Sequence, residues 1–465
     1  MSLRALGLDV GLSGTRAAVV DESGALLGRG RVACTSLLRS AERVEHDPTE
    51  WIGEVVGAAR QALLEAEVES VDAVGIGALG PAPVLVDGNL RPLAPAPLFS
   101  LDPRAEPLRR KLAADLGLPD GGIGQDHALP KVLRMLEDNP NDVSRVAWVL
   151  DATGFLVAAL TGRAVIDPIT LGDHVLEGFE QPVRVPEVLP ADAIAGGLLP
   201  EAASRLGLLT ATPVAVGTYD TYVDVAGTGT TEPGQSCVLL GSTLILGSIV
   251  ADPLDVDGLR RTRHLGEGWF IGGWTSTAGS FLEWADEVLA GSDDGLADLR
   301  PGAGGLVVLP YLAGERAPIW DPAARGLVLG LTLNTTAAKL RRAALDGVCL
   351  SAKDIAARLA TAAPPVAVWR LGGGGARKAA WVQAVADALG SRLEVVEGAG
   401  EAIPAALLAL RAIGIVVEPK IARVVEPDPV NRDLYARVFD VYSGLYPSLA
   451  SSMHTLGQFA TEDPP

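Results

Sequence analysis

Two similar strand–turn–strand patterns open the two halves of this 465-residue chain. In each pattern, two apolar runs of strand length flank a short turn of glycine and small polar residues. The first comprises residues 3–9 and 15–20 around Gly11, Ser13 and Gly14, and the second comprises residues 235–240 and 244–250 around Gly241, Ser242 and Thr243. Strand and helix patterns alternate after each one. The repetition predicts an α/β fold of two duplicated domains, 1–224 and 225–465, with a cleft between them.

The start of the chain carries clear local signals. A third strand is expected over residues 25–33, so that the chain opens with a three-stranded meander. A helix is expected to begin at Pro48, because Asp47 can cap its first turn and Glu50 can complete a capping box.

Composition narrows the class of protein. The net charge is −19, and a surface of this sign repels nucleic acid and anionic membranes. The longest apolar run, residues 402–417, contains a proline and an arginine and is too short to span a bilayer. No leader precedes the first strand, so a cytoplasmic protein is expected. The three cysteines lie far apart and are expected to be reduced thiols: Cys34, Cys237 and Cys349.

The first turn has the parts of a phosphate site. A polyphosphate needs a bend lined with backbone N–H donors, and glycine lets the backbone approach it closely. A carboxylate at the end of a strand, here Asp9, can hold Mg²⁺ together with phosphate oxygens. An ordinary hairpin turn explains the same residues, so this stretch alone does not decide between the two interpretations.

Two later segments place polar or flexible groups at the ends of expected strands. Asp220 follows the short apolar run 214–217, where it can accept a hydroxyl proton as a general base or cap the next helix. Glycines 372–375 follow the strand expected over 366–371. They permit close contact with a flat ligand such as adenine, or they form a left-handed turn. The chain has no Walker A or dinucleotide fingerprint, so a nucleotide requires another architecture.

The sequence resembles the FGGY carbohydrate kinases along nearly its whole length. The most specific match is the stretch LPYLAGERAPIWDPAARGLVLG, residues 309–330. Further matches are Glu45-His46-Asp47-Pro48 with Trp51, Asp102-Pro103-Arg104-Ala105, Leu160-Thr161-Gly162 with Asp167, Arg342–Gly347, Trp381 with Gln383 and Asp387, and the tail from Pro427 to Leu449. The Gly-Glu-Arg-Ala-Pro segment brings the chain closest to the xylulokinase-like branch of that family.

The resemblance implies the actin-like ATPase fold, in which two ribonuclease H-like domains close on a sugar and ATP. It implies transfer of the ATP γ-phosphate to a hydroxyl of a small sugar, such as a ketopentose or related polyol. Asp220 would be the catalytic base, and Asp9 and Asp220 would hold Mg²⁺ and meet across the gap between the domains. The implied nucleotide contacts are Gly11, Ser13, Gly14, Thr15 and Arg16 in the first turn, Gly241, Ser242 and Thr243 in the second, and Gly373 and Gly374 at the adenine.

The segment expected beside the sugar departs from the family pattern. Where xylulokinase-like members have Gln-Met-His-Gly, this chain has Leu79-Gly80-Pro81-Ala82. The implied substrate contacts are Leu79, Pro81, Asp102, Asp220 and Thr221, of which Asp102 can equally cap a helix. The loss of hydrogen-bonding side chains leaves the identity of the sugar open.

Two other functions stay open at this point. One is a catalytically silent nucleotide-binding or regulatory protein on the same fold. The other is a hydrolase that relies on Glu315. The oligomeric state is also open, with a homodimer as one expectation.

Overall fold

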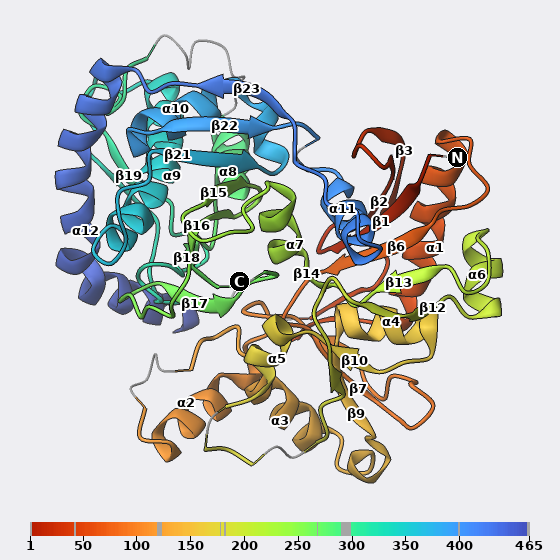
Figure 1. The fold of residues 1–465 in the computed structure, drawn as a ribbon. Helices are drawn as coiled ribbons and strands as arrows, with labels where there is room; N and C mark the ends of the chain where they lie inside the picture. Colours follow the sequence, from red (N-terminus) through yellow and green to blue (C-terminus); the bar gives the residue numbers. More distant parts are fainter. Residues whose placement is uncertain are drawn as a thin grey trace. The chain divides into compact units, whose positions relative to one another are not determined.

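The computed structural model describes residues 2–40, 43–118, 123–176, 178–180, 183–266, 268–289, 299–398 and 400–462. The chain divides into two compact units (Figure 1). Unit 1 comprises Met1–Gly227 with Glu401–Pro419, and unit 2 comprises Thr228–Gly400 with Lys420–Pro465. The sequence-based boundary after residue 224 falls inside helix α7 (Asp220–Gly227). That division also placed residues 401–419 in the second domain, whereas they belong to unit 1.

Unit 1 is built on a seven-stranded mixed sheet. The strand order is β12–β13–β6–β1–β2–β3, and β14 also pairs with β6. β6 runs parallel to β1, β13 and β14, whereas the β1–β2–β3 meander is antiparallel. The strands are β1 (Arg4–Gly11), β2 (Gly14–Asp21), β3 (Leu26–Ala33), β6 (Ala73–Ala78), β12 (Ile194–Gly197), β13 (Pro213–Ala215) and β14 (Thr218–Tyr219). The expected opening meander is therefore confirmed.

Helices and short strands extend unit 1 beyond this sheet. The helices are α1 (Pro48–Glu65), α2 (Glu106–Asp115), α3 (Ala128–Asp138), α4 (Ala152–Thr161), α5 (Pro168–His174), α6 (Pro200–Leu206), α7 and α11 (Ile403–Ala412), with 3-10 turns η1 (Pro103–Ala105) and η3 (Val143–Arg145). The small sheets are β4 (Leu37–Arg39) with β5 (Val44–His46) and β8 (Ala96–Pro97), β7 (Pro83–Val86) with β9 (Trp148–Asp151), and β10 (Val165–Ile166) with β11 (Glu187–Val188).

The first helix begins at the residue that the sequence predicts. The Asp47 side chain accepts a hydrogen bond from the backbone N–H of Thr49, and Pro48 is the first helical residue. The expected capping box is wrong, because the backbone N–H of Asp47 donates instead to the carbonyl oxygen of Ser36. The cap therefore also ties the start of α1 to the segment that follows β3.

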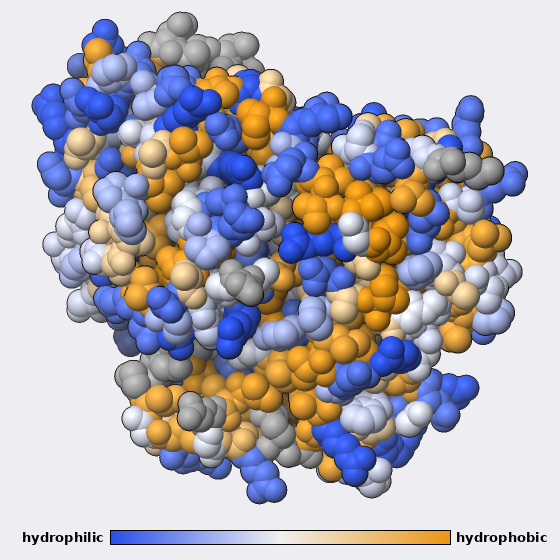
Figure 2. Space-filling model, viewed as in Figure 1, coloured by the Kyte–Doolittle hydropathy of each residue, from blue (hydrophilic) through white to orange (hydrophobic). Residues whose placement is uncertain are grey.

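One face of the unit 1 sheet is covered by a helix from far along the sequence. α11 packs against β1 and β6, where Gly7 and Gly75 are partners in the strand register. A Cβ added at Gly75 would lie 2.0 Å from the carbonyl oxygen of Ala405, and one at Gly7 would lie 2.2 Å from the backbone nitrogen of Ala406. The bare glycine backbone therefore sets how closely α11 approaches the sheet. Figure 2 shows apolar side chains at the surface around α11.

The opposite face of this sheet carries the main core of unit 1. Side chains alternate along β1, so that Leu6, Leu8 and Val10 point away from α11. They pack in a cluster that includes the fully buried Trp51 of α1 and Phe155 of α4. Asp9 follows the same alternation and falls on the side of the sheet that faces α11.

Unit 2 repeats the sheet topology of unit 1. Its strand order is β17–β18–β16–β15–β21–β22–β23. An antiparallel meander (β15, β16, β18) is again followed by two parallel neighbours (β21, β22) and a final antiparallel strand (β23). The strands are β15 (Ser236–Leu240), β16 (Leu244–Val250), β17 (Arg260–Arg263), β18 (Trp269–Trp274), β21 (Val368–Gly372), β22 (Arg392–Val396) and β23 (Ile421–Val425). The duplication expected from the sequence is confirmed.

Helices and a short strand pair complete unit 2. They are α8 (Gly279–Val288), α9 (Ala337–Leu359), α10 (Ala379–Leu389) and α12 (Pro429–Glu462), with the 3-10 turn η4 (Gly374–Arg377) and the strand pair β19 (Val307–Leu309) and β20 (Leu327–Leu329). Inside the core, Asp346 of α9 accepts hydrogen bonds from Arg342 at 2.9 Å and from the hydroxyl of Tyr435 on α12 at 2.7 Å. Within the described ranges, no helix combines the length and apolar character that a membrane crossing needs.

The contact between α11 and the sheet leads to a stability prediction. Gly75→Ala should lower the free energy of unfolding by about 1–3 kcal/mol, because its methyl group must push the backbone of α11 away from β6. Gly88→Ala is the control, since a Cβ there meets no atom within 4 Å. Urea unfolding followed by circular dichroism measures both variants, and equal midpoints would contradict the prediction.

Candidate active site

Three strands of unit 1 bring two acidic residues to one edge of the sheet. Asp9 on β1 and Thr218 on β14 both pair with Gly77 of β6, one from each side. Asp220 follows two residues after Thr218, at the start of α7. The carboxyl ends of parallel strands are the usual place for ligands in α/β sheets. Both carboxylates belong to unit 1, so the expectation that they meet across a gap between domains is wrong.

Asp220 is held in an environment that favours its protonated form. Burial, together with the negative charge of Asp9, raises the pKa of Asp220 to about 7. Its Oδ1 accepts a hydrogen bond from the backbone N–H of Thr221 at 2.6 Å, and the Thr221 hydroxyl lies 3.3 Å from the same oxygen. A carboxyl group that titrates near neutral pH can take up a proton in one step and release it in another.

Asp9 is paired with a cation across the hairpin. Asp9 and Arg16 are partners in the β1–β2 register, and Nη1 of Arg16 lies 3.2 Å from Oδ2 of Asp9. Burial raises the pKa of Asp9, although the charge of Arg16 opposes this shift. The pair therefore places one negative and one positive group beside Asp220.

Asp224 is a third carboxyl group at this edge, and the sequence analysis did not select it as a site residue. It lies four residues after Asp220, one turn further along α7. Burial and then the charges of Asp9 and Asp220 raise the pKa of Asp224 well above its ordinary value. The i, i+4 spacing of two aspartates on a helix is the sequence signal that could have identified it. Among the described residues, no group of three His, Cys, Asp or Glu side chains is arranged to hold a metal ion.

The first turn is tight and is supported from within. Gly11 and Gly14 pair across it, with Leu12 and exposed Ser13 between them. Gly14 has φ +136°, a conformation that favours glycine. Thr15 has no exposed surface, and its hydroxyl donates to Oε2 of Glu54 at 3.0 Å. The Thr15 side chain therefore faces the interior of unit 1, so the expected contact of Thr15 with the nucleotide is left to its backbone and stays a prediction.

The segment that differs from the Gln-Met-His-Gly pattern is buried and apolar. Leu79 is 2% exposed and Pro81 is also buried. A Cβ at Gly80 would lie 2.1 Å from the ring of Tyr219, the residue just before Asp220. The Tyr219 hydroxyl is buried and has no hydrogen-bond partner within the described part of the chain. Tyr219 therefore fills the space that a larger side chain at position 80 would need.

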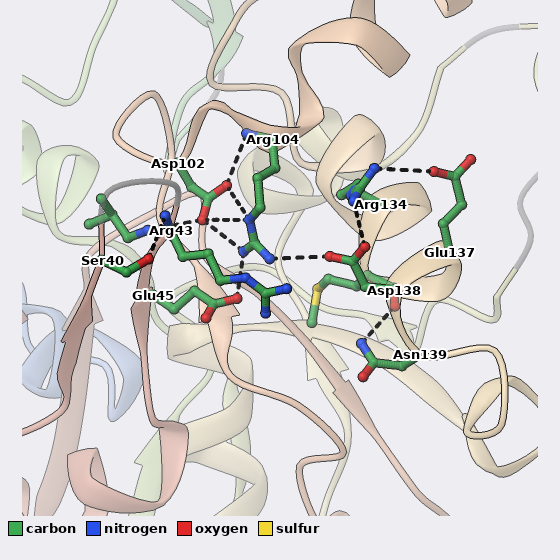
Figure 3. A network of polar contacts seen from close by, with 11 residues as sticks. Ser40, Arg43, Glu45, Asp102, Arg104, Arg134, Glu137, Asp138 and Asn139 are labelled. Carbon is green, nitrogen blue, oxygen red and sulfur yellow. Dashed lines mark hydrogen bonds and ion pairs between the residues drawn. The ribbon is translucent and has the colours of Figure 1, made fainter. Parts of the chain in front are cut away.

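Asp102 is part of a network of charged groups centred on Arg104. Figure 3 shows Asp102, Glu45 and Asp138 converging on the guanidinium of Arg104. The distances from Arg104 are 2.8 Å to Asp102 and 3.2 Å to Asp138. Asp102 also accepts from the backbone N–H of Arg104 and caps η1, so its capping role is confirmed, although it is buried and not at the surface. A contact between Asp102 and a substrate stays a prediction.

Unit 2 carries the second turn and the glycine loop at one edge of its own sheet. The residues Gly241-Ser242-Thr243 join β15 to β16, and the carbonyl oxygen of Ser242 accepts from the backbone N–H groups of Ala278 and Ser280 near the start of α8. β15 and β21 are parallel, with Leu239 opposite Gly372. The glycine loop therefore follows the same carboxyl edge as the second turn.

The glycine loop lies directly against the end of β15. Gly373 has φ +83°, and a Cβ there would lie 2.5 Å from the carbonyl oxygen of Leu240. The glycines therefore form a turn with a positive φ at Gly373, but its ψ of 164° lies outside the left-handed helical region that the sequence analysis expected. The contact of Gly373 and Gly374 with adenine stays a prediction.

Glu315 has a structural role in unit 2. Its Oε1 accepts hydrogen bonds from the backbone N–H groups of Ser276 at 2.6 Å and Arg316 at 2.8 Å. Burial raises the pKa of Glu315 to about 7. These bonds tie the loop at 314–318 to the residues after β18, and they account for Glu315 as a structural residue.

Comparisons with known proteins extend these findings to the whole chain. Residues 4–227 match the N-terminal domain of the FGGY family of carbohydrate kinases, and residues 237–413 match its C-terminal domain. A gluconokinase of Bacillus subtilis (strain 168) is 24% identical over 456 residues, covering 88% of this chain and 87% of that protein. A xylulose kinase of the same strain is 25% identical over 485 residues, covering 95% and 96%.

A solved structure shares the fold. The crystal structure of gluconate kinase from Lactobacillus acidophilus matches with a TM-score of 0.88 at 19% identity, over 98% of this chain and 100% of that one. This likeness confirms the two-domain actin-like ATPase fold that the sequence motifs implied. Because the family matches cover both halves of the sequence, the chain belongs to the FGGY family of carbohydrate kinases.

Proposed function

We propose that this protein transfers the γ-phosphate of ATP to a hydroxyl group of a small neutral sugar, a xylulose-like ketopentose or a related polyol. The observation that carries the proposal is Asp220, a half-buried carboxyl group with a pKa of about 7 beside the Asp9–Arg16 pair. It lies at the carboxyl edge of parallel strands, where an α/β sheet presents groups to a ligand.

Asp220 would act as the general base. A base is most effective when its pKa lies near the working pH, and the pKa of Asp220 satisfies this condition. As the sugar hydroxyl oxygen forms its bond to the γ-phosphorus, Asp220 takes the hydroxyl proton, and the bond from the γ-phosphorus to the bridging oxygen breaks. Thr221 holds the carboxylate in place through its backbone N–H. Orientation and charge neutralisation then supply most of the rate enhancement, as in other phosphoryl transfers.

The donor set fits a magnesium–nucleotide complex. Asp9 and Asp220 offer carboxylate oxygens, which Mg²⁺ prefers together with phosphate oxygens and water. The single charge of Arg16 acts on Asp9, Asp220 and Asp224, so a further cation would relieve their repulsion. When bound, Mg²⁺–ATP supplies the phosphoryl group with part of its charge neutralised. The residues that would contact it are Gly11, Ser13, Gly14 and Arg16 in unit 1, and Gly241, Ser242, Thr243, Gly373 and Gly374 in unit 2.

The charge of unit 1 supports a neutral sugar over a sugar acid. The two relatives described above are named gluconokinase and xylulose kinase, so their names point to different substrates. A sugar carboxylate would need a cation to offset the acidic edge. Arg104 is engaged by Asp102, Glu45 and Asp138, and Arg16 is engaged by Asp9. Like charges placed close together repel strongly when they are partly buried.

One observation favours the alternative of a catalytically silent nucleotide-binding protein. Leu79 and Pro81 are buried and apolar, and Tyr219 fills the space at Gly80. An ADP-release assay across pentuloses, hexuloses, glycerol, tetritols and gluconate decides between the two. Turnover with a neutral sugar or polyol supports the kinase, turnover with gluconate alone rejects the neutral substrate, and ATP binding without turnover on any compound supports the silent protein.

Removal of the proposed base gives the first activity prediction. Asp220→Asn should lower kcat by about 10²–10⁴-fold while ATP binding is retained, because the amide cannot accept the hydroxyl proton. Asp115→Asn, an exposed aspartate on α2, is the matched control and should keep wild-type turnover. Coupled ADP release and calorimetry with ATP measure the two effects, and unchanged turnover in Asp220→Asn would remove Asp220 as the base.

The raised pKa of Asp220 also predicts how stability depends on pH. The folded pKa of Asp220, about 7, exceeds the ordinary value of 3.8. The contribution of this carboxyl group to the free energy of unfolding is therefore fully present below pH 4 and is lost as pH rises through 7. The Asp220→Asn variant has no such loss. Between pH 4 and pH 8 its free energy of unfolding should therefore rise relative to that of wild type by on the order of 2 kcal/mol. The effect is limited to this size because the carboxyl group is partly exposed. Urea unfolding in metal-free and nucleotide-free buffer tests this, and a pH-independent difference would contradict it.

A further inference from the structure

A buried carboxylate lies behind the first turn and has no part in the chemistry described above. Glu54 of α1 is 2% exposed. Its Oε2 accepts a hydrogen bond from the hydroxyl of Thr15 at 3.0 Å. Its Oε1 accepts from the backbone N–H of Thr35 at 2.7 Å, from the Thr35 hydroxyl at 3.1 Å, and from the backbone N–H of Ser36 at 3.0 Å. One side chain therefore joins the start of β2 to the segment that follows β3.

The segment that follows β3 is itself bonded to the turn. The backbone N–H of Cys34 donates to the carbonyl oxygen of Ser13 at 3.2 Å. At the next residue, a Cβ added at Gly14 would lie 2.2 Å from the carbonyl oxygen of Val32. The turn thus rests on residues 32–34. Glu54 links the segment that follows β3 to the first residues of β2 through its hydrogen bonds.

The neighbours of Glu54 favour a charged acceptor, because the two backbone N–H groups at its Oε1 can only donate. All four groups that contact it are donors: two backbone N–H groups and two hydroxyls. A carboxylate meets these donors with two oxygens. A glutamine could turn its amide oxygen toward these N–H groups and donate from its NH₂ to the Thr15 hydroxyl, but bonds to a neutral amide are weaker than charge-assisted bonds to a carboxylate.

We propose that Glu54 is the positioning residue of the first phosphate turn, holding the backbone N–H groups of Ser13 and Gly14 where they meet the phosphates of ATP. This inference rests on the proposed kinase function. Glu54 touches neither substrate nor nucleotide, and it acts through Thr15 and through the segment at 34–36. A turn displaced by a fraction of an ångström loses contacts that depend on exact direction, and nucleotide affinity falls.

The primary test compares two variants of α1. Glu54→Gln should weaken ATP binding about 10-fold, as expected when charge-assisted hydrogen bonds are replaced by bonds to a neutral amide, and should raise the KM for ATP without changing the KM for the sugar. Glu65→Gln is the control, because Glu65 is exposed at the end of the same helix and pairs with Arg29, away from Thr15 and residues 34–36. Its ATP affinity should equal that of wild type. Titration calorimetry with ATP and Mg²⁺ gives the affinities of all three proteins.

Two substitutions at Thr15 test the same contact from its other side. Thr15→Val removes the hydroxyl with little change in volume and should weaken ATP binding to a similar degree. Thr15→Ser retains the hydroxyl and should keep near-wild-type affinity. In the Glu54→Gln/Thr15→Val double variant the losses should be less than additive, because both remove one interaction.

Amide hydrogen exchange at residues 11–16, measured without nucleotide, separates this proposal from the kinase proposal. Faster exchange at the turn in Glu54→Gln, with the melting temperature retained, is the expected result. Wild-type exchange and wild-type ATP affinity in this variant would overturn the role of Glu54. A loss of affinity that merely follows the unfolded fraction would overturn it as well. A wild-type chain that binds no ATP would instead reject the kinase function, while the exchange data would still decide whether Glu54 orders the turn.

Discussion

Crowding of negative charge at the carboxyl edge of the unit 1 sheet is the constraint on which the rest of the site depends. The sheet brings Asp9 and Asp220 to the two sides of β6, and α7 adds Asp224 one turn later. Arg16 offsets part of this charge. Burial then makes the charged forms costly, so the pKa of each carboxyl group rises. A site of this kind is relieved by a proton or by a cation, and both are exchanged during phosphoryl transfer.

The duplicated topology explains why the phosphate-type turns occur where they do. In each unit the first two strands form a hairpin whose inner strand runs parallel to the next strand of the sheet. The hairpin turn therefore lies at the carboxyl edge in both units. Unit 1 adds aspartates to this edge, whereas unit 2 adds the glycine loop that begins at Gly373. The same sheet topology thus presents acidic side chains in unit 1 and a glycine loop in unit 2.

The elements that depend on local sequence were predictable, and those that depend on distant contacts were not. The bounds of β16 (Leu244–Val250) and the cap at Asp47 follow from apolar runs and turn residues, which act over a few positions. Local patterns placed Asp9 and Asp220 at the ends of strands, and the family resemblance along the whole chain implied their roles. The role of Glu54 depends on Thr15, which is 39 residues away, and no local pattern marks such a pair. The packing of α11 on Gly7 and Gly75 could not be predicted either, because it joins residues that lie far apart in the sequence.

The place of α11 has a consequence for how the protein is made. Unit 1 needs residues 401–419 to cover one face of its sheet, yet the rest of that unit ends at Gly227. A ribosome adds roughly 5–20 residues per second, so the intervening 170 or so residues take on the order of 10–35 seconds to emerge. During that interval the glycine-lined face around Gly7 and Gly75 lacks its helix and is open to other chains. A chaperone that binds nascent unit 1 would shield this face until residues 401–419 have emerged.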